Sequence, residues 1–361
     1  MARPAKAGLN LGALRHNVSI ARSLAPDTRL MAVVKANAYG HGSIAMAQTL
    51  EPLVDALAVA CSEEALELRA AGVTCPILLM EGVFEAHELI TAAQHGLWVT
   101  IDNDTQLRWL EETRLPAPLD CWLKIDTGMH RLGVLPEQFQ DFHQRLLASG
   151  KLRAPPVLST HFASADELDN PQTARQLALF ESTCSGFEGL RSAANSPAVL
   201  AWPQSHYDWI RPGYMLWGNS PFAEPQPQAA GLQPVMTLSS AVISVRSVGV
   251  GERVGYGGSW QAQRPSRVAT VTIGYGDGYP RTASSGTPVL IDGRRAPLVG
   301  RVSMDMITVD ITDLPPVAIG APAILWGEGL PVTEVACTTG TSGYELLTRM
   351  PSRTPRIITT T

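Results

Sequence analysis

Eight short apolar runs alternate with longer segments of helical composition between residues 30 and 220 of this 361-residue chain. Strands that alternate with helices imply a parallel sheet, and eight such strands predict a (β/α)8 barrel of the TIM type, an α/β fold. The runs are Leu30–Ala36, Ala56–Ala60, Pro76–Met80, Leu97–Ile101, Leu119–Ile125, Val157–Phe162, Leu190–Asn195 and Trp209–Leu216.

Two of the intervening segments show how the helices are recognised. Ser62–Ala71 begins with a hydroxyl that can cap a helix, followed by acidic residues that suit the helix's positive end, and Asp104–Glu112 has a similar composition. The last two runs are weaker strand signals, because Leu190–Asn195 is polar and Trp209–Leu216 contains Pro212. An open, doubly wound sheet is therefore the alternative fold on this pattern alone.

The pattern changes after residue 233. Ala241–Val248, Val268–Ile273 and Met306–Ile311 alternate at period two and are rich in β-branched residues, and Asp292-Gly293 is a hairpin turn signal. Pro221–Pro234, dense in Pro, Gln and Ala, resembles a linker. We expect a barrel over residues 11–232 and a mainly antiparallel β domain over residues 233–361.

Composition excludes several classes of protein. The net charge is −5 and no long run of Lys and Arg occurs, which argues against binding to nucleic acid or to an anionic membrane surface. The N-terminus lacks a secretory signal and no run of 18 apolar residues is present, so we expect a cytoplasmic protein without a membrane span. We expect buried, reduced thiols and no metal site, because the five cysteines lie far apart: Cys61, Cys75, Cys121, Cys184 and Cys337.

Polar and basic residues stand at five of the eight expected strand ends. In a barrel of this kind the working groups project from the carboxyl ends of the strands, so these residues would converge on one mouth. They are Lys35, the segment from Lys124 to Arg131, His161, the pair Asn195-Ser196, and Arg211. This convergence predicts the functional site better than any single residue does.

Each of these residues also has an ordinary structural explanation. Lys35 follows the buried run Met31–Val34 and can act as a nucleophile toward an aldehyde, or it can simply extend to solvent. The loops Ala194–Pro197 and Arg211–Tyr214 carry small residues and the Ser196 hydroxyl, which suit a phosphate, but they could equally be plain turns.

Two further patterns remain open at this point. His161 and Arg211 could form a hydrogen-bonded pair in the mouth, or each could be a structural residue. The segment Ile273–Tyr279 is rich in glycine, but no helical pattern follows it, so it does not fit a dinucleotide-binding loop. We interpret it as a tight loop that presents Tyr275, with a plain hairpin corner as the alternative.

Seven motifs, in order along essentially the whole chain, resemble those of the alanine racemase family. The first is the long and specific Val-Val-Lys-Ala-Asn-Ala-Tyr-Gly-His-Gly sequence around Lys35. The full set is Val33–Gly42, Lys124–Gly133, Ser159–Ala163, Ala194–Ser196, Ile210–Gly218, Gly274–Arg281 and Gly300–Asp305.

The resemblance implies pyridoxal 5′-phosphate in the barrel mouth, held as a Schiff base on Lys35. Tyr39, Ser196 and Tyr344 would hold the phosphate, together with backbone amides near Gly213 and Tyr214. Asn195 would also belong to the cofactor site, and Arg211 would face the pyridine nitrogen while bonded to His161. Arg131 and Met304 would contact the substrate, and Lys124 would be the lysine that is carbamylated in this family and orients Arg131.

Racemisation needs two acid–base groups on opposite faces of the substrate. By resemblance, Lys35 serves one face, and Tyr275, contributed by a partner subunit, serves the other. This implies a homodimer with shared active sites, in which residues 233–361, with residues 1–10, reach the partner's site. An arginine at the pyridine nitrogen does not readily accept a proton, so transamination would be suppressed.

Other activities stay open. A decarboxylase of the same architecture would need groups for a longer substrate's second polar end, which the motifs do not show. A non-catalytic pyridoxal phosphate carrier would need no β domain, whereas a broad-specificity amino-acid racemase would share every motif. One departure from the family is Ser192, which stands where some members carry a histidine stacked on the cofactor ring.

Overall fold

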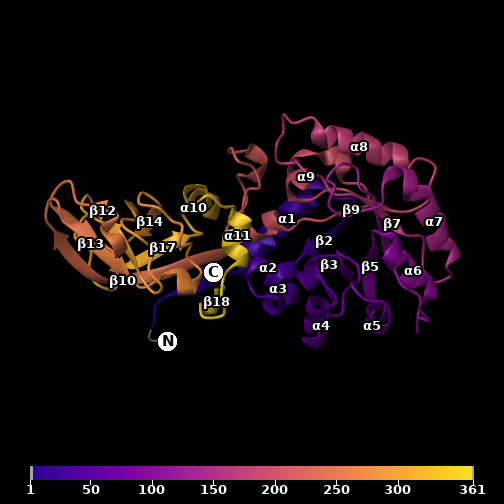
Figure 1. Cartoon of the computed structure of the whole chain (residues 1–361), viewed down its shortest axis with the longest axis horizontal. Coiled ribbons are helices and arrows are strands. Elements are labelled where there is room, and N and C mark those ends of the chain that lie inside the picture. The colour runs from indigo at the N-terminus through magenta and orange to yellow at the C-terminus, as the bar shows by residue number, and fades with distance from the viewer. Residues whose placement is uncertain (1–2, 360–361) are drawn as a thin grey trace.

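The chain folds into a barrel of strands and helices joined to a separate sheet domain, as the computed structural model in Figure 1 shows. The structure describes residues 3–359. The barrel lies on the right of the view and the sheet domain on the left. The chain passes from one to the other through residues 221–234, which contain a short 3-10 turn at Pro227–Ala229.

Eight parallel strands close the barrel, which confirms the (β/α)8 prediction over the open sheet. Closure is made by the first and last strands, with Arg29 opposite Trp209 and Leu30 opposite Ile210. The strands are β2 (Arg29–Val33), β3 (Ala56–Val59), β4 (Ile77–Leu79), β5 (Leu97–Ile101), β6 (Cys121–Lys124), β7 (Val157–Ser159), β8 (Arg191–Ser192) and β9 (Trp209–Ile210). The last two are the shortest, since polar residues and Pro212 limit their pairing.

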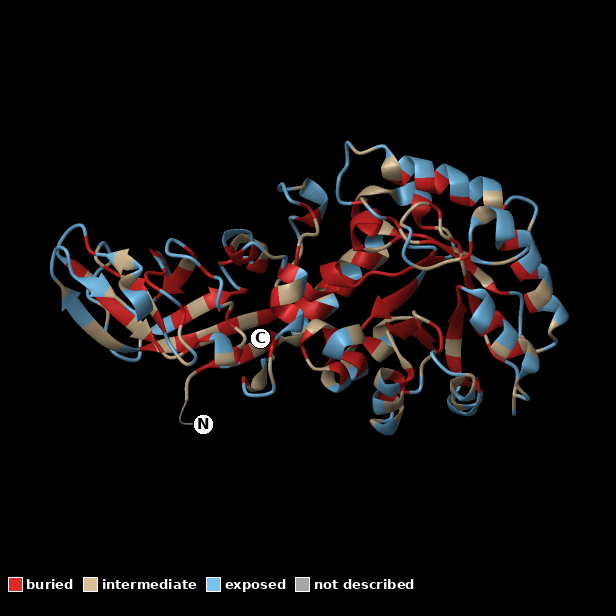
Figure 2. Cartoon of the chain, viewed as in Figure 1, coloured by how far each residue is buried: buried red, intermediate tan, exposed pale blue. Residues whose placement is uncertain are grey.

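Helices cover the outside of the barrel. Figure 2 shows buried strands at its centre and helices whose outward faces are exposed. The helices are α1 (Leu11–Leu24), α3 (Ser43–Leu50), α4 (Ser62–Ala70), α5 (His87–His95), α6 (Asp104–Glu112), α7 (Phe139–Ala148), α8 (Gln172–Thr183) and α9 (Ser196–Ala201), with the short turn α2 (Lys35–Tyr39) after the first strand.

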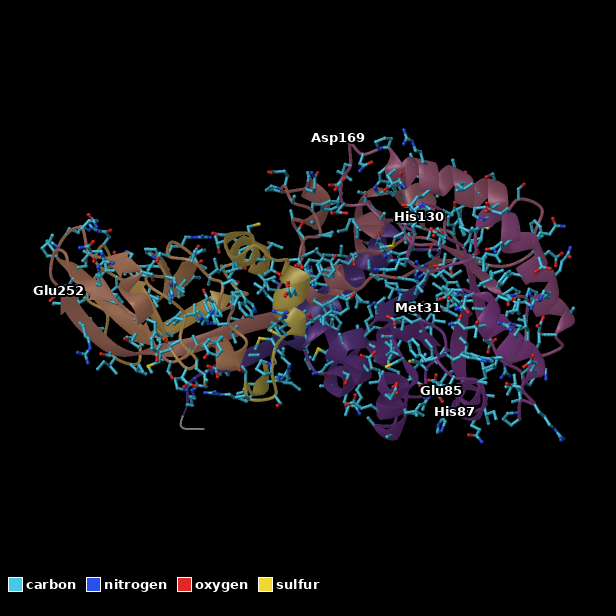
Figure 3. All side chains as sticks on the ribbon, in the orientation of Figure 1. Met31, Glu85, His87, His130, Asp169 and Glu252 are labelled. Carbon is cyan, nitrogen blue, oxygen red and sulfur yellow. The ribbon has the colours of Figure 1, made fainter. Side chains whose placement is uncertain are left out.

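Aromatic rings fill the barrel interior below the mouth. The rings of Trp98, Trp122 and Trp209 lie 5.6–6.4 Å apart, centre to centre. Met31 and Leu78 pack with them, and Figure 3 labels Met31 within the barrel. The interior is therefore a packed core, and space for a ligand is left at the carboxyl ends of the strands.

The second domain is built on an eight-stranded sheet, in the order β15-β14-β17-β10-β1-β18, with β13 on β10 and β16 on β13. All of its pairs are antiparallel except β1 with β18, which confirms the mainly antiparallel prediction. The strands are β1 (Lys6–Asn10), β10 (Met236–Val248), β13 (Ser266–Val271), β14 (Pro288–Ile291), β15 (Arg294–Pro297), β16 (Ile307–Asp310), β17 (Pro322–Trp326) and β18 (Arg356–Thr359), with a separate pair β11 (Arg253–Val254) and β12 (Trp260–Gln261).

Local details of this domain follow from its turns and ends. Asp292 and Gly293 take positive φ angles of 50° and 74° between β14 and β15, as the predicted hairpin requires. Because β1 pairs with β10 and β18, both ends of the described chain lie in this sheet. Two helices that the sequence pattern did not indicate, α10 (Val332–Thr339) and α11 (Gly343–Thr348), complete the domain.

Two expectations need correction. Ser62 is the first residue of α4 rather than its cap, and its hydroxyl donates to Glu88 instead. All five cysteines are free thiols, but only Cys121 and Cys184 are buried, whereas Cys61 and Cys75 are half-buried and Cys337 is exposed on α10. Within residues 3–359 no helix is both long and apolar enough to cross a membrane.

Candidate active site

A cavity of about 910 Å³ opens at the carboxyl ends of the barrel strands. It brings together ten of the predicted site residues, from five strand ends and from the second domain: Lys35, Tyr39, Lys124, Arg131, His161, Asn195, Ser196, Arg211, Gly213 and Tyr344. Its volume lies in the range of sites for small molecules. The convergence predicted from the strand ends is therefore present in the fold.

Lys35 stands at the start of a left-handed turn. Ala36, Asn37, Ala38 and Tyr39 all have φ between 51° and 55°, a conformation that costs roughly 1–2 kcal/mol for each such residue. The turn places Lys35 and Tyr39 in the same cavity. It ends at Gly40, where a Cβ atom would lie 1.9 Å from the carbonyl oxygen of Leu347 in α11, so only glycine fits.

Two polar side chains hold this turn in place. The Glu64 carboxylate accepts the backbone N–H of Ala36 at 2.7 Å and that of Ala60 at 2.8 Å, and so joins the ends of two strands. The Asn37 side chain accepts the N–H of Ser43 at 2.7 Å. The sequence did not predict this role of Glu64. An acidic residue near the start of a helix is already accounted for by the positive end of that helix.

Hydroxyl groups gather around Gly213. The Ser196 hydroxyl accepts the backbone N–H groups of Gly213 at 2.9 Å and Met215 at 3.2 Å, which leaves its own hydrogen to donate. A Cβ atom on Gly213 would lie 2.7 Å from the Tyr39 hydroxyl oxygen. Glycine at this position therefore leaves room for the Tyr39 hydroxyl, which together with the Ser196 hydroxyl suits an anion that accepts hydrogen bonds.

Three tyrosines stand together at the side of the cavity near Ser196 and Gly213. The ring of Tyr344, from α11, stacks on Tyr214 with 3.7 Å between ring centres, and it lies 6.2 Å from Tyr39. Burial raises the pKa of Tyr39 to about 12 and also raises the pKa of Tyr344. These phenols stay protonated at neutral pH, so Tyr39 and Tyr344 are hydrogen-bond donors to the cavity. Tyr214 itself supports this side of the cavity from behind.

Arg211 is a buried cation at the end of the last barrel strand. Its guanidinium donates to the Ser192 hydroxyl and to the carbonyl oxygen of Thr160, the latter at 2.6 Å. Burial lowers the pKa of Arg211 to about 10, so the group stays protonated at neutral pH. None of its hydrogen bonds within the described chain reaches the His161 ring, so that predicted pair is not formed here. Ser192 anchors the arginine instead.

Basic side chains surround His161. The pKa of His161 is held well below its usual value, first by burial and then by the charges of Arg211, Lys124, Arg131 and Lys35. Burial and the same arginines lower the pKa of Lys124 to about 8. Four basic side chains, Lys35, Lys124, Arg131 and Arg211, therefore converge in the cavity, which favours ligands that carry phosphate and carboxylate groups.

Arg131 is presented by a tight loop after β6. One carboxylate oxygen of Asp126 accepts the backbone N–H groups of Gly128, Met129 and His130 at 2.9–3.1 Å, and this bends the chain back on itself. The Arg131 side chain is consequently exposed at the rim, where an entering carboxylate would meet it.

Asn195 has a structural use in addition to its place in the cavity. Its side-chain oxygen caps α9 by accepting the N–H of Ala198 at 3.3 Å, and its amide donates to the carbonyl oxygen of Phe162 at 3.5 Å. These contacts fix the loop from which Ser196 projects. Glu81 and Asp166 also line the cavity, and no motif in the sequence had indicated them.

Tyr275 and Met304 lie elsewhere, in the second domain. Neither is among the described residues that line the cavity, and their side chains are 39% and 52% exposed. The two loops that carry them are bonded together, through the N–H of Tyr275 to the Ser303 carbonyl and the N–H of Gly276 to the Met304 carbonyl, at 3.0 and 2.9 Å. The glycine-rich segment forms a 3-10 turn (Tyr275–Asp277) that presents Tyr275, as predicted.

Comparison with known proteins matches both parts of the chain. Residues 9–221 match the alanine racemase N-terminal domain, and residues 235–358 match the alanine racemase C-terminal domain. The chain is 52% identical over 354 residues to a catabolic alanine racemase of Pseudomonas putida, covering 98% of both sequences. It is 53% identical over 346 residues to a biosynthetic alanine racemase of Escherichia coli, covering 96% of both.

The solved structures agree with this result. The crystal structure of the biosynthetic alanine racemase from Pseudomonas aeruginosa matches with a TM-score of 0.96 and 48% identity, and 99% of each chain is covered. The family resemblance of the sequence motifs is thereby confirmed. This chain belongs to the alanine racemase family and is an amino-acid racemase.

Proposed function

We propose that this chain interconverts L-alanine and D-alanine at the barrel mouth, with pyridoxal 5′-phosphate bound there. One arrangement carries the proposal: the Lys35 amine, the Ser196 and Tyr39 hydroxyls at Gly213, and a cluster of basic side chains all face one cavity. Membership of the alanine racemase family supports alanine as the substrate. The assignment of individual roles to residues is our proposal.

The residues present fit the cofactor. The phosphate would accept hydrogen bonds from Ser196, Tyr39 and Tyr344 beside Gly213, where a Cβ atom would crowd the Tyr39 hydroxyl. The backbone around Gly213 and Tyr214 would complete this end of the site. Arg211 would face the nitrogen of the pyridine ring, and His161 and Asn195 would lie beside the ring.

When bound, the cofactor supplies an electron sink that acidifies the α-C–H bond of an amino acid joined to it. Arg211 stays protonated, so it would donate to the ring nitrogen and would not transfer a proton to it. A weaker electron sink suffices for proton exchange and limits transamination. Arg211 would thereby direct the reaction toward racemisation.

Arg131 would bind the substrate carboxylate, and Met304 of the partner subunit would limit the space for the substrate side chain. We also propose that the Lys124 amine is carboxylated. A carbamate there would be an anion beside Arg131 and would orient its guanidinium. The lowered pKa of Lys124, about 8, supports this proposal because only the neutral amine attacks carbon dioxide.

Two groups would exchange the α-proton. Lys35 Nζ would remove or return it on one face, and the hydroxyl of Tyr275 of the partner subunit would act on the other. General acid–base groups of this kind contribute about 10²–10⁴-fold each to a rate. In one direction Lys35 is the base and tyrosine the acid, and in the other direction the roles reverse.

The position of Tyr275 supports an active site that is shared between two subunits. It is partly exposed in the second domain and does not line the cavity of its own chain within residues 3–359. A head-to-tail homodimer would bring the second domain of each subunit (residues 233–361, with residues 1–10) over the barrel (residues 11–232) of the other. Each cavity would then receive its second acid–base group.

Chiral analysis tests the proposed activity. Purified protein with pyridoxal phosphate is incubated with L-alanine, and with L-serine, L-lysine and L-arginine in parallel. We expect D-alanine to form well ahead of the other D-amino acids. Racemisation of another amino acid in preference to alanine would overturn the substrate assignment. Decarboxylation without racemisation would overturn the reaction itself.

A further inference from the structure

A buried carboxylate lies directly beneath the Tyr275 loop. Asp277, two residues after Tyr275, is fully buried, and its Oδ2 atom accepts the backbone N–H of Gly274 at 2.9 Å. Arg3 donates to both carboxylate oxygens, with Nη2 to Oδ2 at 2.7 Å, and Arg353 Nε lies 3.2 Å from Oδ1. Two arginines from the two ends of the chain therefore converge on one buried acid.

The same arginines also hold the neighbouring Met304 loop. Arg353 forms an ion pair with Asp305, and Arg3 Nη2 donates to the Asp305 carbonyl oxygen at 3.2 Å. We call these four residues, Arg3, Asp277, Asp305 and Arg353, the arginine–aspartate cluster. Together with the backbone hydrogen bonds between the two loops, the cluster joins both loops into one unit.

The arginine–aspartate cluster also packs against the backbone of the Tyr275 loop. A Cβ atom on Gly276 would lie 2.8 Å from Arg353 Nη1, so the guanidinium lies immediately beside the backbone that follows Tyr275. The Thr354 hydroxyl donates to the Asp277 carbonyl oxygen at 2.8 Å. The loop is thus bonded from below at its carboxylate, its carbonyl and its backbone, while the Tyr275 side chain extends from the surface.

A buried carboxylate that loses one of two cationic partners is destabilised, because part of its charge is left without compensation. The local backbone would shift to bring the carboxylate to water or to a new partner. Tyr275 lies two residues away, so the same shift would displace its hydroxyl. A displacement of about 1 Å at a reacting group can cost about a hundredfold in rate.

We infer that Arg3 and Arg353, through Asp277, position Tyr275 for proton transfer in the partner subunit's active site. They are positioning residues, since they act through the loop and touch no reacting atom. The inference rests on the proposed function, in which Tyr275 is the second acid–base group. Arg3 and Arg353, near the two ends of one chain, would thus position a tyrosine that acts in the active site of the other chain.

The test is α-proton exchange in deuterium oxide, measured separately for L-alanine and D-alanine with the pyridoxal-phosphate-loaded dimer. Exchange of one enantiomer depends on Lys35 and exchange of the other on Tyr275. For Arg353→Gln we expect Tyr275-dependent exchange, and racemisation with it, to fall about tenfold to hundredfold. Lys35-dependent exchange should change by less than about twofold. A general loss of folded protein would lower both exchanges equally, so their ratio is the decisive quantity.

Further variants keep the test informative. Arg3→Gln alters a partly exposed residue ahead of the first strand, so it is suited to the case in which Arg353→Gln fails to fold. Arg353→Lys keeps the charge and should recover part of the Tyr275-dependent exchange. Arg264→Gln is the matched control, because it breaks an exposed pair with Asp313 at the opposite end of β13 and should leave the ratio unchanged.

Tyr275→Phe separates this inference from the proposed function. If Tyr275→Phe slows both exchanges equally, the two-base scheme itself is wrong. If Tyr275→Phe abolishes one exchange alone while Arg3→Gln and Arg353→Gln leave the ratio as in the unaltered protein, the two-base scheme stands and the positioning role is refuted.

Discussion

The Glu64 carboxylate accepts the backbone N–H of Ala36 at 2.7 Å, one residue after the lysine that we propose as the cofactor's anchor. Its second oxygen accepts the N–H of Ala60 at 2.8 Å, at the end of the adjacent strand. The lysine therefore emerges from a left-handed turn that is held by a side chain from another βα unit. Together with the Asn37 side chain, this contact holds four residues without a glycine at positive φ angles.

Glu64→Ala should destabilise the protein and misplace Lys35. Two backbone N–H groups lose a charged acceptor, and hydrogen bonds to charged groups contribute about 1.5–3 kcal/mol each, so we expect a loss of about 3 kcal/mol in the free energy of unfolding. Urea denaturation measures this loss. Glu63→Ala removes an exposed acid from the same helix turn and serves as the control. Equal midpoints for the two variants would contradict the role of Glu64.

Gly213→Ala should weaken cofactor binding. The added methyl group would lie 2.7 Å from the Tyr39 hydroxyl and displace this group, which we assign as a donor to the phosphate. We expect the dissociation constant of pyridoxal phosphate to rise about tenfold or more, equal to about 1.4 kcal/mol. Absorbance titration of the cofactor-free protein measures it. Gly231→Ala, whose Cβ meets only ordinary contacts at 3.4 Å, should bind as the parent protein does. An unchanged constant for Gly213→Ala would refute the phosphate assignment.

Carboxylation of Lys124 should depend on pH. With a pKa of about 8, roughly half of the Lys124 amines are neutral at pH 8 and about a hundredth at pH 6. Carbamate formation uses the neutral amine and releases a proton, so both effects favour the carbamate as pH rises. With ¹³C-bicarbonate, we expect a carbamate resonance at pH 8 that fades by pH 6 and is missing in Lys124→Ala. A resonance that persists in Lys124→Ala would contradict this assignment.

Sequence pattern was sufficient to predict the barrel, because closed barrels repeat one local unit whose apolar runs are visible in the chain. It also predicted which strand ends would meet, since the carboxyl ends of parallel strands share one edge. Lys35, His161 and Arg211 could therefore be placed together without knowledge of the side-chain contacts. The weak seventh and eighth strands closed the barrel despite having only two residues each.

The remaining features depend on contacts between distant residues. Nothing in the segment from Ala36 to Tyr39 indicates a left-handed turn, because alanine and tyrosine ordinarily avoid positive φ. Arg3 and Asp277 are separated by 274 positions, so no local pattern relates them. Local residue types had likewise suggested a His161–Arg211 pair, whereas the fold gives the guanidinium to Ser192 and to backbone carbonyls.

Mixing two inactive variants tests the central claim most directly, namely that each active site combines Lys35 of one subunit with Tyr275 of its partner. Lys35→Ala and Tyr275→Phe should each be unable to racemise alanine. After subunits are exchanged at equal amounts, about half of the dimers are mixed, and each mixed dimer regains one intact site of two. We predict recovery of about a quarter of the parent activity. No recovery, with mixed dimers shown to be present, would contradict the shared site.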